Sequence, residues 1–214
     1  MPRLKQVARA HAAPHLRRYY DALFGDRDPV AQPGTATGTP GNWWTVFGLV
    51  PYIFEHATLH MGMFGMFADA APSKLDPKLR ELAILRTGYV QASQFVYSQH
   101  CKVARIAGLT EDEIGSIPSW QVSSIYSERQ RALLAYIDCL ILQAGRVPDP
   151  AFNALKSQLS DEDILELTYH TLMYNLYAVS SKALKLEYDD VPDRITEIPA
   201  PSGGSSAAGF NQNQ

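Results

Sequence analysis

The spacing of apolar residues along the chain predicts helices almost throughout. Hydrophobic residues recur every three or four positions over residues 3–24 and again over residues 42–71, as one buried face of a helix requires. Residues 25–42 are instead rich in Gly, Pro, Thr and Asp and predict a loop. This loop is longer than a minimal connector. The sequence leaves open whether it is a lid or an insert.

Capping residues mark the boundaries of the later helices. Side chains that accept a hydrogen bond from the first helical turn, or a proline at the first helical position, predict helix starts. They stand at Asp76-Pro77, Thr110 with Glu113, Ser127 with Gln130, Asp149-Pro150 and Ser160, and the helix after Ser160 extends to about Leu186. Gly108 and Gly145 occupy positions typical of helix ends. No run alternates as a strand does, so we predict an all-α fold of about seven or eight helices.

The same pattern divides the chain into three parts. We expect an N-terminal helix and Gly/Pro-rich loop over 1–41, a helical domain over 42–196, and a disordered tail over 197–214, where Pro, Gly, Ser, Ala, Asn and Gln dominate. With 46% hydrophobic and 19% charged residues in 214, the chain as a whole has the composition of an ordinary globular protein.

Charge and cysteine content narrow the classes of function. A net charge of -3 gives no electrostatic footprint for nucleic acid. No stretch approaches the roughly 20 apolar residues of a membrane-spanning helix. The basic N-terminus lacks the apolar block of a secretory signal. A transit peptide is an alternative interpretation of this segment, but we favour an ordinary first helix. Cys101 and Cys139 show neither disulfide nor zinc spacing, so we expect a reducing, cytoplasmic setting.

The candidate chemistry centres on His100. A helix from about Ala92 to Ile106 would place this histidine on one face with Ser93, Val96, Tyr97 and Ala104. Burial there lowers the pKa of an imidazole unless an acid such as Glu81 offsets it, and a histidine tuned near neutrality can both donate and accept a proton. On its own, His100 would more often be a core residue bonded to a backbone carbonyl. Glu81 alone would more often be a surface charge or a partner for Arg80 or Arg86.

Three segments in order resemble the carboxymuconolactone decarboxylase-like family, which includes the alkylhydroperoxidase-D enzymes. They are residues 79–86 (LRELAILR), Gln99-His100, and residues 104–110 (ARIAGLT). The resemblance extends from about Trp43 to Leu186. It implies an alkylhydroperoxidase-D-like helical domain without cofactor or metal, in a symmetric homo-oligomer, often a trimer or hexamer.

The redox branch of that family has a Glu, eleven residues, and then Cys-x-x-Cys-x-x-x-His. Glu81 and His100 match this frame, whereas Ser93 and Val96 stand at the two sulfur positions. Disulfide exchange needs an attacking thiolate and a resolving thiol, and neither position supplies one. Cys101 lies off the face of His100 and has no partner in register. We therefore do not expect a dithiol peroxidase, and we rank a peroxidase using Cys101 alone last.

The leading hypothesis that the resemblance implies is a cofactor-independent carbon–carbon lyase, a decarboxylase or isomerase, acting on a small lactone or carboxylate. His100 would handle the proton and Glu81 would orient the imidazole. Arg86 would hold negative charge, unless it pairs with Glu81, and Tyr97 would donate a further hydrogen bond. The decarboxylase branch often has Glu-Tyr-Glu-Trp where this chain has residues 94–97 (QFVY). That departure motivates an alternative, a ligand-binding or assembly protein that has lost catalysis.

Further candidates come from neighbouring helices. Ser93, His60 and Tyr174 are expected to line the cavity together with Arg86 and Tyr97, because the resemblance brings their helices to the active-site region. His56 and His60 have a spacing that can hold a metal, but without a recognised third ligand we favour packing. The Met- and aromatic-rich helix from Tyr52 to Asp69 is expected to form core, an oligomer surface or the wall of a ligand site.

Overall fold

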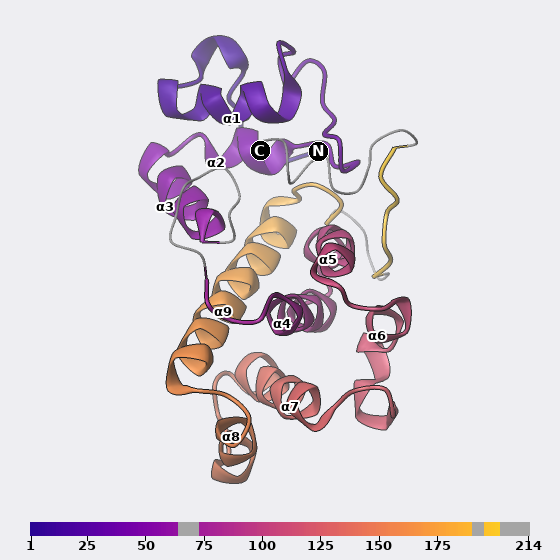
Figure 1. Cartoon of the computed structure of the whole chain (residues 1–214). Coiled ribbons are helices and arrows are strands. Elements are labelled where there is room, and N and C mark those ends of the chain that lie inside the picture. The colour runs from indigo at the N-terminus through magenta and orange to yellow at the C-terminus, as the bar shows by residue number, and fades with distance from the viewer. Residues whose placement is uncertain (64–72, 190–194, 202–214) are drawn as a thin grey trace. The chain divides into compact units, whose positions relative to one another are not determined.

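The computed structural model describes residues 1–63, 73–189 and 195–201, and helices are the regular secondary structure of this described part (Figure 1). The all-α prediction is confirmed, with nine α-helices and two 3-10 helices in these ranges. The number of helices exceeds the expected seven or eight, and two of them, α6 and α8, are short, with 5 and 8 residues. In order, the elements are η1 Arg9–His11, α1 Pro14–Phe24, α2 Asn42–Phe47, α3 Pro51–Gly62, α4 Pro77–Val90, α5 Gln94–Ala107, α6 Glu111–Gly115, η2 Ile117–Val122, α7 Glu128–Leu142, α8 Asp149–Lys156 and α9 Asp161–Leu184.

The predicted helix caps account for most of these boundaries. The side chain of Asp76 accepts a hydrogen bond from the backbone N–H of Lys78 and begins α4. Both expected capping boxes are present, at the starts of α6 and α7. Pro148 rather than Asp149 is the cap residue of α8, so this helix begins one residue early. The expected helix from Tyr52 to Asp69 is described only as far as α3, and its last residues lie outside the described ranges.

The described part of the chain divides into two compact units. In the described ranges, the first unit holds residues 1–63, 73, 181–189 and 198–201, and the second holds residues 74–180 and 195–197. Glu197, which we assigned to the disordered tail, is bound in the second unit, where its carboxylate accepts two hydrogen bonds of 2.7 Å from Arg105. Residues 202–214 of the expected tail lie outside the described part.

In the first unit an aromatic cluster joins α1, α2 and α3. The ring of Trp43 stacks on Phe47 at 4.0 Å between centroids and meets Trp44 edge-on. The carboxylate of Glu187 accepts hydrogen bonds from the backbone N–H groups of Gly41 and Trp43, at 2.9 and 2.6 Å, where α2 begins. Glu187 therefore fixes the end of the 25–42 loop within this unit.

In the second unit α4 lies between α5 and α7 (Figure 1). Residues 81–88 of α4 are all buried, which explains why this helix has no clean polar face. Gly88 permits the close approach of α5, because a Cβ there would stand 2.9 Å from the backbone nitrogen of Tyr97. The spacing between α4 and α5 depends on this glycine.

No helix in the described ranges is both long enough and apolar enough to cross a membrane.

Candidate active site

A buried hydrogen bond joins the two residues that the sequence frame singled out. Glu81 from α4 and His100 from α5 are 2% and 8% exposed, and Oε2 of Glu81 lies 2.7 Å from Nδ1 of His100. Burying a carboxylate is costly unless it is paired, so this contact is a strong constraint on both side chains. The pair is the centre of the candidate site.

The bond also selects the tautomer of the imidazole. An ionised carboxylate can only accept, so Nδ1 of His100 donates to Glu81 and Nε2 is the nitrogen left for exchange with a substrate. No described residue forms a hydrogen bond with Nε2. The other carboxylate oxygen of Glu81 accepts from Nε of Arg80 at 3.2 Å, which offsets part of its charge.

Helix α9 closes the pair from a third direction. The ring of Tyr174 meets the ring of His100 in a T-shaped contact at 4.5 Å between centroids. Burial, with the nearby carboxylate of Glu81, raises the pKa of the Tyr174 phenol well above its usual value. Tyr174 is therefore a neutral hydroxyl that holds the imidazole ring in one orientation.

His170 lies one turn before Tyr174 on α9 and is 1% exposed. Burial lowers its pKa from 6.5 to about 4, assisted by Arg80 and opposed by Glu166 and Glu81. His170 is not among the site residues predicted from the sequence, although the carboxylate of Glu81 lies close enough to act on its pKa. The available signal was its spacing of four residues from Tyr174, which puts the two side chains on one helix face.

Arg86, expected to hold negative charge on a substrate, is bound elsewhere. Its Nε and Nη2 atoms donate to the two carboxylate oxygens of Asp138 at 2.6 and 3.0 Å, and Nη1 donates to the carbonyl of Ile117 at 3.0 Å. These bonds join α4 to α7 and η2. The expected alternative, an ion pair between Arg86 and Glu81, is not found, because Arg80 occupies that place.

Ser93 and Tyr97 have local contacts that explain their burial. The Ser93 hydroxyl accepts a hydrogen bond from the backbone N–H of Val96 at 3.2 Å and caps α5. The Tyr97 hydroxyl lies 3.5 Å from the carbonyl oxygen of Ile114. Burial raises the pKa of Tyr97, as does the neighbouring Cys101. Their part in binding a substrate stays a prediction.

Cys101 is 1% exposed and belongs to the hydrophobic core of the second unit. Burial, together with the carboxylate of Glu197, raises the pKa of its thiol to about 12, and Arg105 and Lys102 act in the opposite direction. A thiol with this pKa is almost entirely protonated at neutral pH and is a poor nucleophile. The local environment therefore does not favour peroxide chemistry at Cys101.

His60 lies on α3 in the first unit and is buried, whereas His56 of the same helix is exposed. Among the described residues, no three His, Cys, Asp or Glu side chains are grouped so that they could hold a metal ion. The place of His60 in the cavity stays a prediction.

Two buried polar residues on α5 were not singled out by the sequence. The amide nitrogen of Gln99, adjacent to His100, is buried and has no hydrogen-bond partner in the described part of the chain. Lys102 is 2% exposed and donates to the carbonyl oxygen of Ser98 at 3.0 Å. Burial lowers the pKa of Lys102, and Glu197 opposes that effect from 3.7 Å. Gln99 belongs to the Gln99-His100 segment of the family resemblance but was given no role there, whereas no sequence pattern marks Lys102.

Comparison with known proteins shows which family and which proteins this chain is similar to. Residues 58–138, which include Glu81 and His100, match the family model described as "Carboxymuconolactone decarboxylase family". The chain is also similar to the uncharacterized protein YnjA of Escherichia coli (strain K12). The two are 24% identical over 187 residues, which cover 87% of this chain and 90% of that protein.

Solved structures share the helical arrangement. A protein of unknown function from Agrobacterium tumefaciens is 25% identical with a TM-score of 0.59, covering 69% of this chain and 96% of its own. The alkylhydroperoxidase AhpD core of a peroxidase-related protein from Ralstonia eutropha JMP134 is 17% identical with a TM-score of 0.67, covering 90% and 98%. The debrominase Bmp8, solved with 2,3,4-tribromopyrrole, is 13% identical with a TM-score of 0.61, covering 92% and 94%. Together, these comparisons show an AhpD-like helical fold, and they show that residues 58–138, which carry Glu81 and His100, are similar to the carboxymuconolactone decarboxylase family.

Proposed function

We propose that the chain is a cofactor-independent lyase or isomerase in which His100 transfers a proton to or from a small lactone or carboxylate substrate. The observation that carries this proposal is the buried 2.7 Å hydrogen bond between Glu81 and Nδ1 of His100. A histidine whose Nδ1 is held by a carboxylate presents a defined Nε2 for general acid–base catalysis. The family match, which includes both residues, supports the same class of reaction.

In a decarboxylation, the bond between the substrate carbon and its carboxylate carbon breaks and CO2 leaves. The electron pair stays on the substrate as a dienolate, and Nε2–H of the His100 imidazolium gives its proton to that carbon. The neutral histidine then takes a proton from solvent. In an isomerisation, Nε2 removes a proton from one carbon and returns it at another. Glu81 stabilises the imidazolium in both reactions through the Nδ1 bond.

The groups proposed to assist His100 differ from those that the sequence suggested. Each nitrogen of the Arg86 guanidinium donates a hydrogen bond to Asp138 or Ile117, so we do not assign it to the substrate. Arg80 is the cation bonded to the pair, and we assign it the role of balancing the charge of Glu81. Gln99 is proposed to donate its amide N–H to a substrate oxygen, because a buried amide without a partner is costly. A homo-oligomer and a cytoplasmic location stay part of the proposal.

The second candidate is a protein that binds its ligand without converting it. It is motivated by Gln94 and Val96, which stand where the decarboxylase branch often has glutamates.

Redox chemistry, which the peroxidase-related neighbour from Ralstonia eutropha brings to attention, ranks last. This chain has Ser93 and Val96 in place of the cysteine pair, and burial raises the pKa of its Cys101 thiol to about 12. We therefore favour proton transfer.

The test is a screen of small lactone acids and hydroxy acids for CO2 release and for isomerised product. With the converted substrate, His100→Ala and Glu81→Gln should each lower kcat/KM by about a hundredfold or more while the circular dichroism spectrum is retained. His11→Ala and Glu128→Gln are matched controls, because both side chains are exposed and distant in sequence from the pair. Full activity of His100→Ala would rule out the mechanism, and recovery of every bound ligand unchanged would favour the binding protein.

A further inference from the structure

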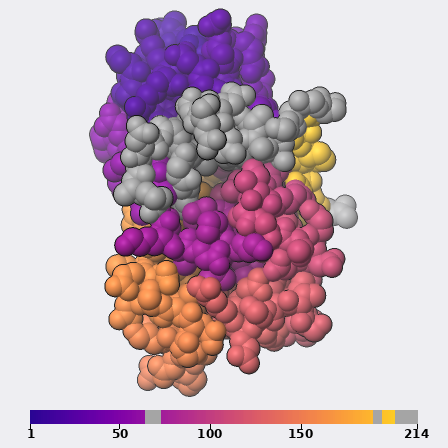
Figure 2. Space-filling view, viewed as in Figure 1, coloured from indigo at the N-terminus to yellow at the C-terminus, as the bar shows by residue number. Residues whose placement is uncertain are grey.

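Three helices of the second unit surround the imidazole of His100. Its own helix is α5, α4 supplies Glu81, and α9 supplies the ring of Tyr174. The backbone N–H of Leu75, just before α4, donates to the carboxylate of Glu166 on α9 at 3.0 Å. Figure 2 shows the purple atoms of the α4 region in contact with the orange atoms of α9. The groups on these three helices therefore decide which charge a substrate can carry beside His100.

The polar groups close to the pair are either uncharged or matched with an opposite charge. Arg80 donates to Glu81 at 3.2 Å, so this cation and this anion offset each other. Burial lowers the pKa of His170 from 6.5 to about 4, so its imidazole is neutral at pH 7. Burial raises the pKa of Tyr174, so its hydroxyl is neutral too. The described surroundings of His100 thus combine one balanced ion pair with neutral groups.

The other cations of α4 and α5 lie away from the pair or are held by acids. Lys78 is exposed, and its side chain lies against Gly108 at the far end of α5. The remaining cations of these helices are Arg86, 2.6 Å from Asp138, Lys102, 3.7 Å from Glu197, and Arg105, 2.6 Å from Glu111.

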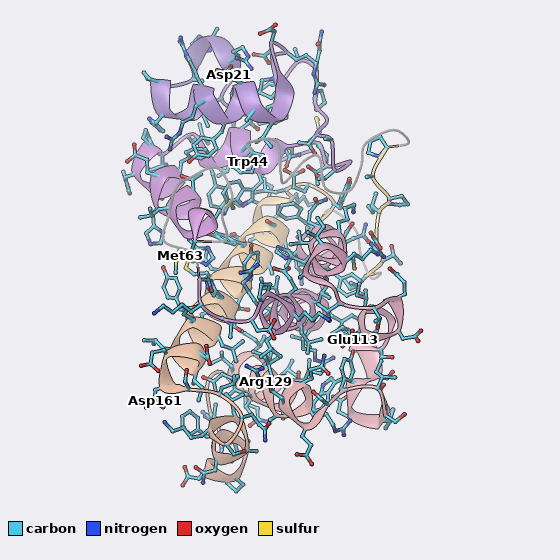
Figure 3. The ribbon with its side chains drawn as sticks, in the orientation of Figure 1. Asp21, Trp44, Met63, Glu113, Arg129 and Asp161 are labelled. Carbon is cyan, nitrogen blue, oxygen red and sulfur yellow. The ribbon has the colours of Figure 1, made fainter. Side chains whose placement is uncertain are left out.

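The same holds for the neighbouring helix α7, where Arg129, labelled in Figure 3, lies 3.9 Å from Asp76. Burying a carboxylate is costly unless a cation or several donors meet it. Within the described part of the second unit, a paired cation could serve a substrate carboxylate only by leaving its own acid unpaired.

The imidazole itself is poorly suited to hold a substrate carboxylate. Nδ1 of His100 is bonded to Glu81, so a carboxylate entering the site would bond to Nε2. That contact would fix the imidazolium form and occupy the nitrogen that must exchange a proton with carbon. A carboxylate would therefore take the position that the reacting C–H group needs.

The adjacent side chain of α5 offers an uncharged donor instead. Gln99 is 8% exposed, and its amide nitrogen is buried without a hydrogen-bond partner in the described ranges. Such a donor costs free energy until an acceptor reaches it. Consecutive helical residues leave the axis about 100° apart, so Gln99 and His100 project from neighbouring positions of α5. One small molecule can place an oxygen at Gln99 and a nearby carbon at His100.

A second uncharged group comes from α9. Thr171 is fully buried, and its hydroxyl has no hydrogen-bond partner in the described part of the chain. It lies three residues before Tyr174, so the two side chains share a face of the helix. Neutral donors on α5 and α9 suit a neutral oxygen such as that of a carbonyl group.

We infer that the site takes an uncharged, unsaturated carbonyl compound, such as a lactone, and shifts a proton from one of its carbons to another without loss of CO2. The inference rests on the proposed function of His100. Nε2 removes a proton from the carbon beside the carbonyl, and the electron pair of the broken C–H bond moves onto the carbonyl oxygen. The amide of Gln99 donates to this enolate oxygen, and the imidazolium returns the proton to the far carbon of the double bond.

The test gives the full chain two probes in D2O and follows them by proton NMR. One is α-angelica lactone, which is uncharged and β,γ-unsaturated; the other is the same ring with a carboxymethyl group in place of its methyl group. We expect deuterium exchange and movement of the double bond, with kcat/KM about tenfold or more higher for the uncharged probe.

Two results would overturn the inference. One is faster conversion of the carboxylated probe, and the other is exchange of neither probe. CO2 release from lactone acids that depends on His100, with the uncharged probe untouched, would leave the proposed role of His100 standing and remove only the substrate class. Exchange that persists in His100→Ala would instead contradict the proposed function.

A variant of Gln99 separates a role in the reaction from a structural one. Gln99→Leu keeps the size of the side chain and removes the buried amide, so the free energy of unfolding should not fall. Its kcat for the uncharged probe should fall about tenfold to a hundredfold, because the donor acts on charge that develops during the reaction. Gln143→Leu, at an exposed position, is the control and should change neither quantity. Unchanged kcat in Gln99→Leu, or a loss of kcat that follows a loss of stability, would contradict the role of Gln99.

Discussion

Arg86 on α4 and Asp138 on α7 form a two-point ion pair, with Nε 2.6 Å from Oδ1 and Nη2 3.0 Å from Oδ2. Trp120 donates its indole N–H to the same carboxylate at 3.0 Å. The two charged side chains are 5% and 16% exposed, so removing one leaves the other poorly solvated. We expect Asp138→Ala to lower the free energy of unfolding by about 3 kcal/mol, measured by urea denaturation.

The matched control for Asp138→Ala is Glu128→Gln, an exposed acid on the same helix, which should change the free energy of unfolding by less than about 0.5 kcal/mol. The ion pair is structural if kcat/KM of the folded Asp138→Ala protein changes little. A large loss of turnover with unchanged stability would instead indicate that Arg86 takes part in binding the substrate.

Gly88→Ala should disturb the contact that brings Glu81 and His100 together. The added methyl group would stand 2.9 Å from the backbone nitrogen of Tyr97, a group that cannot rotate away. We expect a loss of about 1–3 kcal/mol in the free energy of unfolding and a lower kcat, because α4 and α5 must separate. Gly115→Ala is the control, since nothing lies within 4 Å of its Cβ position. Equal stability of the two variants would contradict the proposed helix contact.

The lowered pKa of His170 predicts that the folded protein loses stability in acid. Its pKa is about 4 in the folded protein against an ordinary value of 6.5, so the unfolded chain binds the proton more readily between these values. The free energy of unfolding should therefore fall as the pH is lowered from 6.5 to 4, by up to about 1.4 kcal/mol per pH unit from this group. Urea denaturation at several pH values measures the slope, and His170→Gln should reduce it.

Glu187 changes the free energy of unfolding in the opposite direction over nearly the same pH range. Burial raises the pKa of its carboxyl from 4.5 to about 7, although hydrogen bonds from Trp43 and Gly41 lower it. The stability due to Glu187 is therefore lost as the pH rises from 4.5 to 7. Because both proteins carry Glu187, the difference between wild type and His170→Gln isolates the histidine. Parallel pH profiles would show that His170 is not a buried neutral group.

Cys101 should resist thiol reagents as long as the chain is folded. Raising the thiol pKa from 9.0 to about 12 lowers the thiolate fraction at pH 8 on the order of a thousandfold. In a Cys139→Ala background, modification by a chromogenic disulfide should be slow in buffer and rapid in urea. Cys101→Ala should also leave turnover of the substrate unchanged. Rapid labelling of Cys101 in the folded protein would instead favour the peroxidase hypothesis.

The local signals in the sequence were sufficient to predict the helices, but not the central pair. Helix caps such as Asp76 and Thr110 act within one turn, so their residue types alone mark where α4 and α6 begin. Glu81 and His100 were found through the spacing of a family motif. Their hydrogen bond crosses between two adjacent helices that the fold packs together.

The remaining contacts depend on residues distant along the chain. Asp138 reaches Arg86 across 52 positions, and no local pattern at Arg86 distinguishes a structural partner from a substrate carboxylate. Glu197 reaches Arg105 from a segment whose composition predicts disorder. The residues around His170 in the sequence do not show which face of α9 is buried, and only the packing of the folded chain decides it. Long-range pairing of this kind requires the folded structure.

The bond that begins α5 has a consequence for how this site changes in evolution. Ser93 and Val96, which stand at the two sulfur positions of the redox branch, are the acceptor and donor of that capping bond. A helix N-terminus stabilises a thiolate, so the same turn would activate a cysteine placed there. The Glu81–His100 pair is held by other contacts and does not require the sulfur atoms. A cysteine pair can therefore be gained or lost within one helical turn while the Glu81–His100 contact is left unchanged.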